Sequence, residues 1–521
     1  MKKYKVFLMK NIIKLFLLTP IVFASCQKNI DLYPQSNITT ENFYKNASDI
    51  QIALNGSYNA LRAPLLEEWK LTELRSDNTI MYSSASKSVP NRDLSDLDLF
   101  IPSTSHSAIY NYWIANYFNI RNVNVILNSL NVNYSAETGV VTSDVTNVDI
   151  TDAQKKIASA EATFIRAYHY FNLVRLYGGV MLIHEPVDPF EALTINRSSV
   201  DDIYKLIIAD LQYAIANGSN TKYASIPTTS LGKVNAWTAK ALLAKVYLTL
   251  NRKTDAIPLL NDIIANSGYG LVTNYADVFA INNEMNKEIL FAVRYKAGGI
   301  GQGSPFPNLF APELSGTAVI NGDGSGFNAP CQDLSNTYNA LDVRKVASIG
   351  IYGTALNNLY PKKMIAPVSL KGDGENDWIV IRYADVLLML AEAQGNTTAS
   401  LALINQTRVR AGLPALTTAT VTTSAIFEKE LATERRLEFT FENIRWFDML
   451  RYNTTMPSQN AIASIQANYA AMWTNHYSKY PSPPPLATIQ GYVTAEKLLL
   501  PIPQREIDNN TRIKIPQNPG Y

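Results

Sequence analysis

The chain has 521 residues, of which 47% are hydrophobic and 17% charged, with 46 basic and 44 acidic side chains. This length permits a large buried core and, at about 150 residues per domain, suggests about three domains. The formal net charge of +2 does not indicate the clustered basic face that nucleic acid requires, so we expect no nucleic-acid partner. Two cysteines exclude a disulfide scaffold, and four histidines leave few ligands for a histidine-based metal centre.

The first 25 residues have the layout of a secretory signal peptide. Five lysines precede a short apolar run, Leu15–Leu18 and Ile21–Ala24, which is shorter than the about 20 residues of a membrane-spanning helix. The run ends in Phe23-Ala24-Ser25-Cys26, which resembles the lipobox of bacterial lipoproteins and predicts a lipid anchor on Cys26. An ordinary cleaved signal is the alternative. Removing the five lysines from the 46 basic residues leaves 41 against 44 acids, a net charge of −3 for the mature chain.

Apolar residues at helical spacing predict helices over much of the remaining chain. In chain order, the predicted helices span residues 47–61, 110–130, 157–177, 202–216, 234–250, 254–265, 381–394, 399–411 and 425–452. Helix 157–177 is expected to end at Gly178 and Gly179. Three tryptophans, Trp113, Trp237 and Trp446, fall on apolar stripes of these helices and are assigned to the core.

The helices at 234–250 and 254–265 resemble a tetratricopeptide unit. Ala239 and Ala244 on the first and Ala256 on the second are small enough to let paired helices approach closely. We therefore predict a mostly α fold, an α-α superhelix of tetratricopeptide-like pairs with minor β structure. Its scaffold is expected at about 40–70, 108–130, 155–290 and 380–452, within a single domain that spans 26–521.

Three stretches interrupt the helical pattern and are expected to be irregular excursions on the ligand side, at about 72–105, 295–378 and 453–498. The first is rich in Ser and Asp. The second begins with Lys296–Pro330, which holds eight glycines in 35 residues and is expected to contain no helix. The third contains the proline-rich run Pro481–Pro485. Long ordered loops of this kind often carry function.

No catalytic motif is recognisable in the sequence: it lacks a nucleophile elbow, a Walker loop, an HExxH zinc motif and a CxxC pair. A glycosidase carboxylate pair needs only closeness in space, so the sequence leaves that chemistry open. His169 lies within helix 157–177, where a structural role is favoured over a catalytic one.

One segment has a partial metal-binding pattern. Asn321, Asp323 and Ser325 stand at positions 1, 3 and 5 of a calcium-type loop, with Gly326 at position 6. Position 12 is Gln332 instead of glutamate, so a plain turn is favoured over calcium, and no cofactor is expected.

The segment around Glu434, Arg435, Arg436 and Glu438 is dense in charges of both signs. Because residues four apart share a helix face, it predicts an ion-paired helix that ties the end of the scaffold to its neighbours.

Five segments occur in an order that carries a family resemblance. They are EATFIRAYHYFNLVRLYGGV (161–180), IRYADVLLMLAEA (381–393), RVRAGL (408–413), ERRLEFTFENIRWFDMLR (434–451) and LLLPIPQREIDNN with QNPGY (498–521). Together with the lipobox, they resemble the SusD/RagB family of nutrient-binding outer-membrane lipoproteins of Bacteroidetes. Asn443 stands where this family commonly has glycine.

This resemblance implies a mostly helical protein on the outer-membrane surface that acts as a lid over a SusC-like TonB-dependent transporter. Such proteins capture glycans, or in some branches peptides, and catalyse nothing. A surface glycoside hydrolase and a pure tetratricopeptide scaffold are the alternatives from other functional classes.

Within the family the ligand site lies in variable loops, which here correspond to the first two excursions. A sugar binder needs exposed aromatic rings and planar hydrogen-bonding groups. The low charge content favours a neutral oligosaccharide over a polyanion, with peptide left open. The residues expected to bind ligand are Asp77, Asn78, Tyr82, Arg92, Arg75, Trp69, Tyr295, Phe306, Phe310, Tyr352 and Trp378.

Overall fold

The computed structural model describes residues 43–81, 91–353, 359–480 and 482–521. Asn46–Tyr521 form one compact unit, distinct from the segment Met1–Lys45. The predicted signal peptide 1–25, the predicted lipidation site Cys26 and the expected ligand residue Tyr82 lie outside the described residues. Within the described ranges, none of the helices combines the length and the apolar character needed to span a bilayer.

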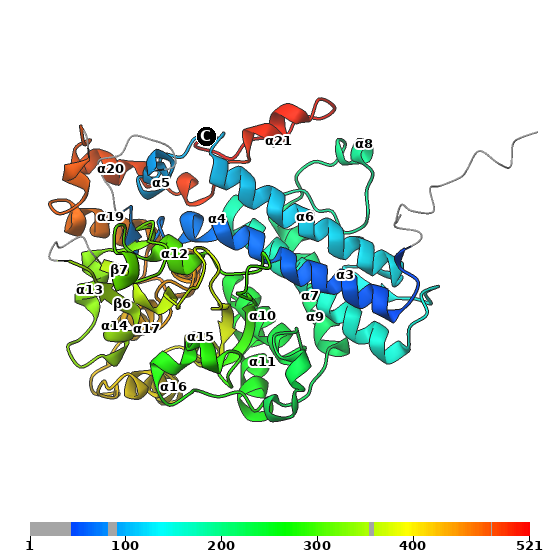
Figure 1. Cartoon of the computed structure of the whole chain (residues 1–521), viewed down its shortest axis with the longest axis horizontal. Coiled ribbons are helices and arrows are strands. Elements are labelled where there is room, and N and C mark those ends of the chain that lie inside the picture. The colour runs from blue at the N-terminus through cyan, green and yellow to red at the C-terminus, as the bar shows by residue number, and fades with distance from the viewer. Residues whose placement is uncertain (1–42, 82–90, 354–358, 481) are drawn as a thin grey trace, which may run out of the picture. The chain divides into compact units, whose positions relative to one another are not determined.

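Helices from the first half of the chain form one part of the scaffold. They are α3 (Ala47–Ala60), α4 (Arg62–Thr72), α5 (Asn91–Asp98), α6 (Ser107–Ser129), α7 (Asp152–Tyr177), α8 (Pro189–Ala192) and α9 (Val200–Asn217). Helix α7 starts with a capping box between Thr151 and Gln154, and it ends, as predicted, at Gly178, whose φ of 72° suits glycine. Helices α3 and α4 follow one another along α6, and α6 packs on α7 (Figure 1).

A second group of helices continues the scaffold, and its first four members pack as two pairs. They are α10 (Ala236–Thr249), α11 (Lys253–Asn266), α15 (Tyr383–Gln394), α16 (Thr398–Arg410), α17 (Ser424–Glu438) and α18 (Arg445–Thr455). Between α10 and α11, the side chains of Ala239, Ala244 and Ala256 are fully buried, which permits the close approach that their size predicts. The predicted mostly helical fold is confirmed, and its helix pairs are consistent with a tetratricopeptide-like arrangement.

The strands are short and form antiparallel pairs. The pairs are β1 (Thr79–Ile80) with β5 (Ala329–Pro330), β2 (Val132–Ser135) with β3 (Val140–Ser143), β4 (Ile289–Val293) with β8 (Trp378–Arg382), and β6 (Ile349–Ile351) with β7 (Leu359–Pro361). Thr79 lies opposite Pro330, so the first pair connects the first excursion to the second. Strands β4 and β8 flank the second excursion and hold its two ends together.

The prediction that Lys296–Pro330 contains no helix is wrong, because α12 (Phe306–Phe310) lies within it. The excursions also contain α5, α13 (Gln332–Thr337), α14 (Val343–Ser348), α19 (Ala461–Met472) and α20 (Leu486–Tyr492), and α21 (Gln504–Asn509) follows them. Helix α12 forms inside the glycine-rich segment because FPNLF contains no glycine and places two aromatic residues, Phe306 and Phe310, four positions apart. Both rings are fully buried, and tertiary burial outweighs the low helix propensity of the flanking glycines.

The predicted helix 425–452 is interrupted. Helix α17 ends at Glu438 and α18 begins at Arg445. Between them Phe441 and Asn443 adopt positive φ angles of 67° and 60°, a conformation incompatible with a continuing right-handed helix. Asparagine tolerates this conformation better than most residues, which explains how Asn443 can occupy a position where glycine is common.

The charged segment forms the expected ion-paired helix, and its partners lie far away in the sequence. Arg344 contacts Glu434 and Glu438, while Arg382 contacts Glu438 and Glu442, all of them buried. These pairs join α17 to the second excursion and to β8. The prediction that this helix ties the scaffold to its neighbours is confirmed.

The core assignments made from helical stripes are also confirmed. Trp113, Trp237 and Trp446 are 2%, 5% and 0% exposed. His169 is fully buried, with its ring nitrogens paired to the side-chain amides of Asn116 and Asn119 at 2.7 and 2.8 Å. Burial lowers the pKa of His169 to about 3, so the ring stays neutral and structural.

Candidate binding groove

An open groove with a volume of about 790 Å³ lies between α3 and α4, α6, and the beginning of the second excursion. Its lining residues are Gly56, Asn59, Ala60, Arg62, Ala63, Leu66, Glu67, Asn111, Ile114, Ala115, Phe118, Tyr295, Gly301, Gly303 and Pro305. This volume falls within the range of about 300–1,000 Å³ that is usual for small-molecule sites. We call this site the α3–α6 groove.

The groove exists because α3 and α4 present small residues on the side that faces α6. Gly56, Ala60 and Ala63 recur at spacings of four and three along α3 and α4, so they lie on one face. On α6 the corresponding positions are Asn111, Ile114 and its neighbour Ala115, and then Phe118. The small side chains leave a hollow, and the larger ones at the ends of each stripe border it.

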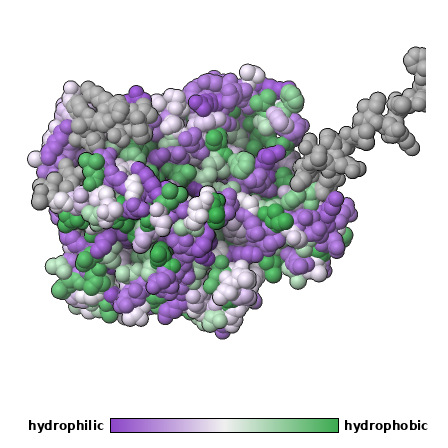
Figure 2. Space-filling view, viewed as in Figure 1, coloured by the Kyte–Doolittle hydropathy of each residue, from purple (hydrophilic) through white to green (hydrophobic). Residues whose placement is uncertain are grey.

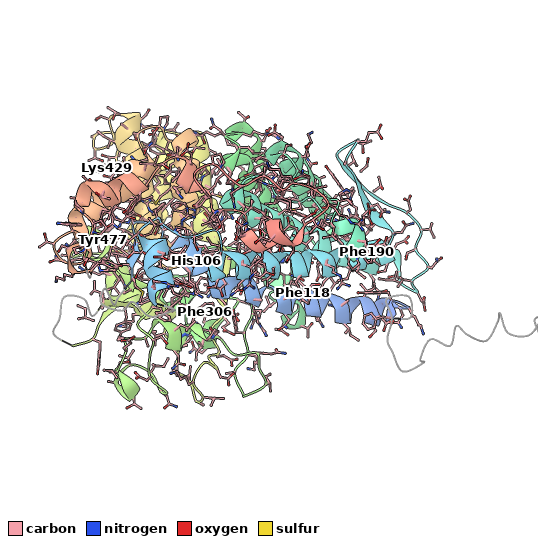
Figure 3. The ribbon with its side chains drawn as sticks, turned by 90° about the horizontal axis from the view of Figure 1, so that it is seen from above. His106, Phe118, Phe190, Phe306, Lys429 and Tyr477 are labelled. Carbon is pink, nitrogen blue, oxygen red and sulfur yellow. The ribbon has the colours of Figure 1, made fainter. Side chains whose placement is uncertain are left out.

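An exposed aromatic ring forms the most prominent apolar part of the groove. Phe118 is 60% exposed, and the nearby groove residues Ile114 and Leu66 are 41% and 40% exposed. Figure 3 places Phe118 on α6, apart from Phe190, another exposed phenylalanine, which lies on α8. On the face shown in Figure 2, apolar side chains are scattered among polar ones. Single exposed apolar residues are common on protein surfaces, and those of the groove differ in lining a concave site.

Arg62 supplies a positive charge to the wall of the groove. Its Nε donates a hydrogen bond to the carbonyl of Arg294 at 2.7 Å, and Nη1 donates to the side-chain oxygen of Asn59 at 2.6 Å. The guanidinium carbon lies 5.1 Å from the centre of the Tyr295 ring, a cation–π distance. Burial lowers the pKa of Arg62, against opposing effects of Tyr295 and Asp377. Arg62 thus connects α4 to the second excursion.

Tyr295 closes the inner side of the groove with a polar group that lacks a partner. The residue is 4% exposed, and its hydroxyl has no hydrogen-bond partner among the described residues. Its backbone N–H donates to Asp377 at 2.9 Å, which fixes the start of the excursion. Burial raises the pKa of the hydroxyl, so it remains a neutral donor at physiological pH.

Two carboxylates hold the glycine-rich edge of the groove. The side chain of Asp373 accepts hydrogen bonds from the N–H groups of Gly298 and Gly299, both at 2.8 Å. Glu375 accepts from the N–H of Ala297 at 3.0 Å. The two backbone hydrogen bonds lower the pKa of Asp373. A β-carbon on Gly303 would lie 2.0 Å from a carboxylate oxygen of Asp373, so only glycine fits there.

Four of the ligand residues expected near the first excursion, Asp77, Asn78, Arg75 and Trp69, are buried, so the expectation of an exposed binding surface is wrong for these four. Asp77 pairs with Arg445, and Asn78 is fully buried, within hydrogen-bond distance of Glu73 and Arg436. The guanidinium of Arg75 lies 4.3 Å from the Trp446 ring centre, and Trp69 is likewise buried. The charges that satisfy Asp77 come from α17 and α18, which are remote in sequence.

Most of the expected aromatic residues form a buried cluster behind the groove. Its ring pairs are Tyr295–Phe306, Phe306–Phe310, Phe306–Trp378 and Trp69–Phe310, with centroids 6.0, 5.5, 4.5 and 5.3 Å apart. All five residues are at most 4% exposed, so the expectation of exposed rings is wrong for them. Tyr295 is the member of this cluster that also lines the groove. The cluster supports the groove from behind.

The remaining expected residues lie elsewhere. Arg92 is exposed, and its guanidinium lies 3.3 Å from Asp93. Tyr352 is half-buried, and its hydroxyl donates to the carbonyl of Leu314 at 3.3 Å. Neither lines the α3–α6 groove. A role in ligand binding stays a prediction for all eleven expected residues, including Tyr82, which lies outside the described residues.

The segment with the calcium-type pattern is held by hydrogen bonds of a turn. A carboxylate oxygen of Asp323 accepts from the N–H groups of Gly316 and Gly324 at 3.2 and 2.8 Å. The side chain of Asn321 donates to the carbonyl of Ser369, and the N–H of Ser325 donates to Asn308. Among the described residues, no group of three His, Cys, Asp or Glu side chains is placed to hold a metal ion.

Phe118, Ile114, Arg62 and Asn59 are groove residues that sequence reasoning missed. The buried stripe of α6 includes Trp113, and Ile114 and Phe118 lie beside that stripe, four positions apart. The available signal for an exposed apolar surface was that both residues are apolar and lie outside the buried stripe of α6. Arg62 gave no comparable signal, because its setting depends on Tyr295, which is distant in sequence.

Comparisons with known proteins agree with this fold. The family described as "Starch-binding associating with outer membrane" matches residues 31–248, and the "SusD family" matches residues 350–521. A SusD-like protein of Formosa agariphila is 25% identical over 542 residues, covering 93% of this chain and 94% of that protein.

Two solved structures show the same fold. A laminarin-binding SusD-like protein superposes with a TM-score of 0.72 at 23% identity, covering 92% of this chain and all of that one. Surface glycan-binding protein A from Bacteroides thetaiotaomicron, in complex with laminarihexaose, has a TM-score of 0.69 at 19% identity and covers 90% and 99% of the two chains.

Proposed function

Because the chain belongs to the SusD/RagB family, we propose that it is a cell-surface protein that binds oligosaccharide in the α3–α6 groove and delivers it to a SusC-like TonB-dependent transporter. The observation that carries the choice of site is the exposed ring of Phe118 within a groove of about 790 Å³. The structural relatives named for laminarin and for laminarihexaose support oligosaccharide as the ligand class.

The chemistry of the groove suits a sugar. A pyranose has a flat C–H face that packs on an aromatic ring, and its hydroxyls require planar or hydroxyl partners around that ring. Phe118 supplies the ring, while Asn59, Asn111 and Arg62 supply amide and guanidinium groups on the walls. The unpartnered hydroxyl of Tyr295 is a further donor at the inner side.

We propose that the protein binds its ligand without hydrolysing it. Glycosidic hydrolysis ordinarily needs two carboxyl groups that flank the scissile bond. Among the described residues that line the groove, Glu67 carries the one carboxylate, and Lys70 forms an ion pair with it at 2.7 Å. This arrangement favours binding over the alternative of a surface hydrolase.

The membrane attachment in this proposal is a lipid on Cys26, after removal of residues 1–25. The family description "associating with outer membrane" supports this location. Incorporation of a radiolabelled fatty acid tests it, with Cys26→Ser as the variant that should lose the label. Copurification of a TonB-dependent transporter with the tagged full-length chain tests the partnership.

Calorimetry on the soluble form that begins at Gln27, against plant, host and microbial glycans, tests the ligand class. Phe118→Ala should weaken the binding of any glycan that binds by about tenfold, through loss of the ring contact. Phe190→Ala is the matched control, because this ring is 69% exposed and outside the groove. Oligopeptide binding without glycan binding would replace oligosaccharide with peptide as the cargo, and equal affinities of the two variants would reject the groove.

A further inference from the structure

The guanidinium of Arg62 is in contact with neutral acceptors only. Its described partners are the carbonyl of Arg294, the amide oxygen of Asn59 and the ring of Tyr295. Within the described ranges it forms no ion pair. Several other arginines of the unit are paired with a carboxylate: Arg166, for example, is buried and lies 2.7 Å from Asp210. Arg62 therefore brings a charge into the groove that the described residues do not neutralise directly.

The acidic groups near Arg62 are already engaged. Glu67, which also lines the groove, is paired with Lys70. Asp377 acts on Arg62 electrostatically, but its carboxylate accepts from the N–H of Tyr295 and is ion-paired with Arg294. Burial, followed by the charge of Glu284, raises the pKa of Asp377 to about 7, so its own charge is incomplete at neutral pH. The charge of Arg62 is thus available to a ligand.

Two of the five N–H donors of the guanidinium are used by the described residues. Nε donates to the Arg294 carbonyl, and one N–H of Nη1 donates to Asn59. Three donors remain, two on Nη2 and one on Nη1, and these can donate to the oxygens of a carboxylate or a sulfate. Nη2 has no hydrogen-bond partner among the described residues. It is not buried, so solvent can reach it.

We propose that the α3–α6 groove selects an acidic oligosaccharide, whose anionic substituent pairs with the unused N–H donors of Arg62 while a sugar ring packs on Phe118. The substituent is a uronic acid carboxylate or a sulfate ester. Both carry neighbouring anionic oxygens that arginine can bind with two hydrogen bonds. This inference rests on the proposed function and specifies its ligand class. An acidic ligand differs from the neutral oligosaccharide that the low charge content of the chain favours.

Matched ligand pairs test the proposal. One pair is an oligogalacturonide and the same oligomer after reduction of its carboxylates to primary alcohols, and the other is a sulfated oligosaccharide and its desulfated form. We expect the anionic member of at least one pair to bind about ten to a hundred times more tightly, the effect of one charged hydrogen-bonding group. The two pairs distinguish carboxylate from sulfate. The preference should decrease as salt is added.

Variants then assign the preference to Arg62. Arg62→Gln should abolish it, while Arg62→Lys should retain only part of it, because lysine keeps the charge and loses the paired donors. Asn59→Asp provides a test that leaves Arg62 in place: the new carboxylate beside Nη1 should neutralise the arginine and weaken anionic ligands selectively. Arg121→Gln, an exposed α6 position outside the groove lining, is the control and should change nothing.

The outcomes separate this inference from the proposed function. If anionic and neutral members bind equally and Phe118→Ala weakens both, oligosaccharide binding stands and the selection of acidic sugars is overturned. A preference for the anionic member that persists in both Arg62→Gln and Asn59→Asp also overturns it. If no oligosaccharide binds at all, the proposed function fails, and this inference fails with it.

Discussion

The carboxylate of Asp77 and the guanidinium of Arg445 form two parallel hydrogen bonds of 2.7 Å across 368 positions of sequence. Both side chains are buried, at 5% and 9% exposure. Arg436 lies 3.6 Å from the same carboxylate. Burial opposes the charge of Asp77, but Arg436 and Arg445 outweigh it and hold the pKa of the carboxyl well below its usual range. The pair connects the first excursion to the end of the scaffold, which makes it structural.

We expect Asp77→Asn to reduce the free energy of unfolding by about 3–5 kcal/mol, because it leaves Arg445 buried without its counter-charge. Urea unfolding followed by circular dichroism measures this loss. Under conditions where the variant is folded, its affinity for ligand should equal that of the parent chain. A variant that is as stable as the parent chain but binds ligand more weakly would instead indicate that Asp77 contacts the ligand.

Asp373→Ala should loosen the glycine-rich edge of the groove. The substitution removes the acceptor of the Gly298 and Gly299 N–H groups, so these amides should exchange with deuterium faster. Hydrogen exchange resolved to this peptide is the measurement, with ligand affinity as a second readout that should decrease. Asp255→Ala, which removes a carboxylate of α11 that is 44% exposed and outside the groove lining, is the control. Unchanged exchange in the Asp373 variant would show that the carboxylate does not hold the loop.

Three buried acids should make the unfolding free energy decrease between about pH 4 and pH 7. Burial is the main cause that raises the pKa of Glu73, Glu161 and Asp377 to about 7 each. In the unfolded chain these groups titrate at about 4, so within this window the folded state binds more protons. Stability attributable to them is therefore present at the acidic end and is lost as the pH rises.

Unfolding measured across this pH range checks the sign. Glu161→Gln should flatten the slope, because it removes one of the three titrating groups. If the unfolding free energy fell with pH more steeply in Glu161→Gln than in the parent chain, the raised pKa assigned to Glu161 would be contradicted.

Cys331 should be inert to thiol reagents in the folded protein. It is fully buried, and burial raises the pKa of its thiol to about 12, so almost no thiolate exists at pH 8. The soluble form that begins at Gln27 contains this cysteine alone. We expect no reaction with a chromogenic disulfide in buffer and one equivalent in denaturant. Rapid stoichiometric labelling of the native protein would contradict the buried position.

Several elements of the fold could be predicted because they depend on local pattern. The period of apolar residues located α6, α7, α10 and α11 to within a few positions, except for the start of α7 at Asp152. The break at Phe441 could not be predicted in the same way. Its positive φ is stabilised within a tertiary arrangement in which residues of the first excursion contact the break: a carboxylate oxygen of Glu73 accepts from the N–H of Asn443 at 2.8 Å.

The ligand residues were harder to predict, because exposure is a property of the whole fold. Asp77 and Trp378 have the chemistry of sugar contacts, yet partners from distant segments bury both. Tyr295 was correctly placed near the excursion and lines the groove. Phe118 lies in a predicted helix of the scaffold, beside its buried stripe. Whether the space next to it stays open depends on the tertiary structure.

The sequence by itself therefore determined most of the scaffold helices, the buried faces of those helices and the family, because each of these follows from periodicity and from short ordered motifs. Only the tertiary structure decided which charges pair and where a groove remains. Ion pairs such as Asp77 with Arg445 and the cation–π contact of Arg62 with Tyr295 join residues hundreds of positions apart. Whether a polar or aromatic side chain meets solvent depends on what the rest of the chain places against it, and that is set by packing across the molecule.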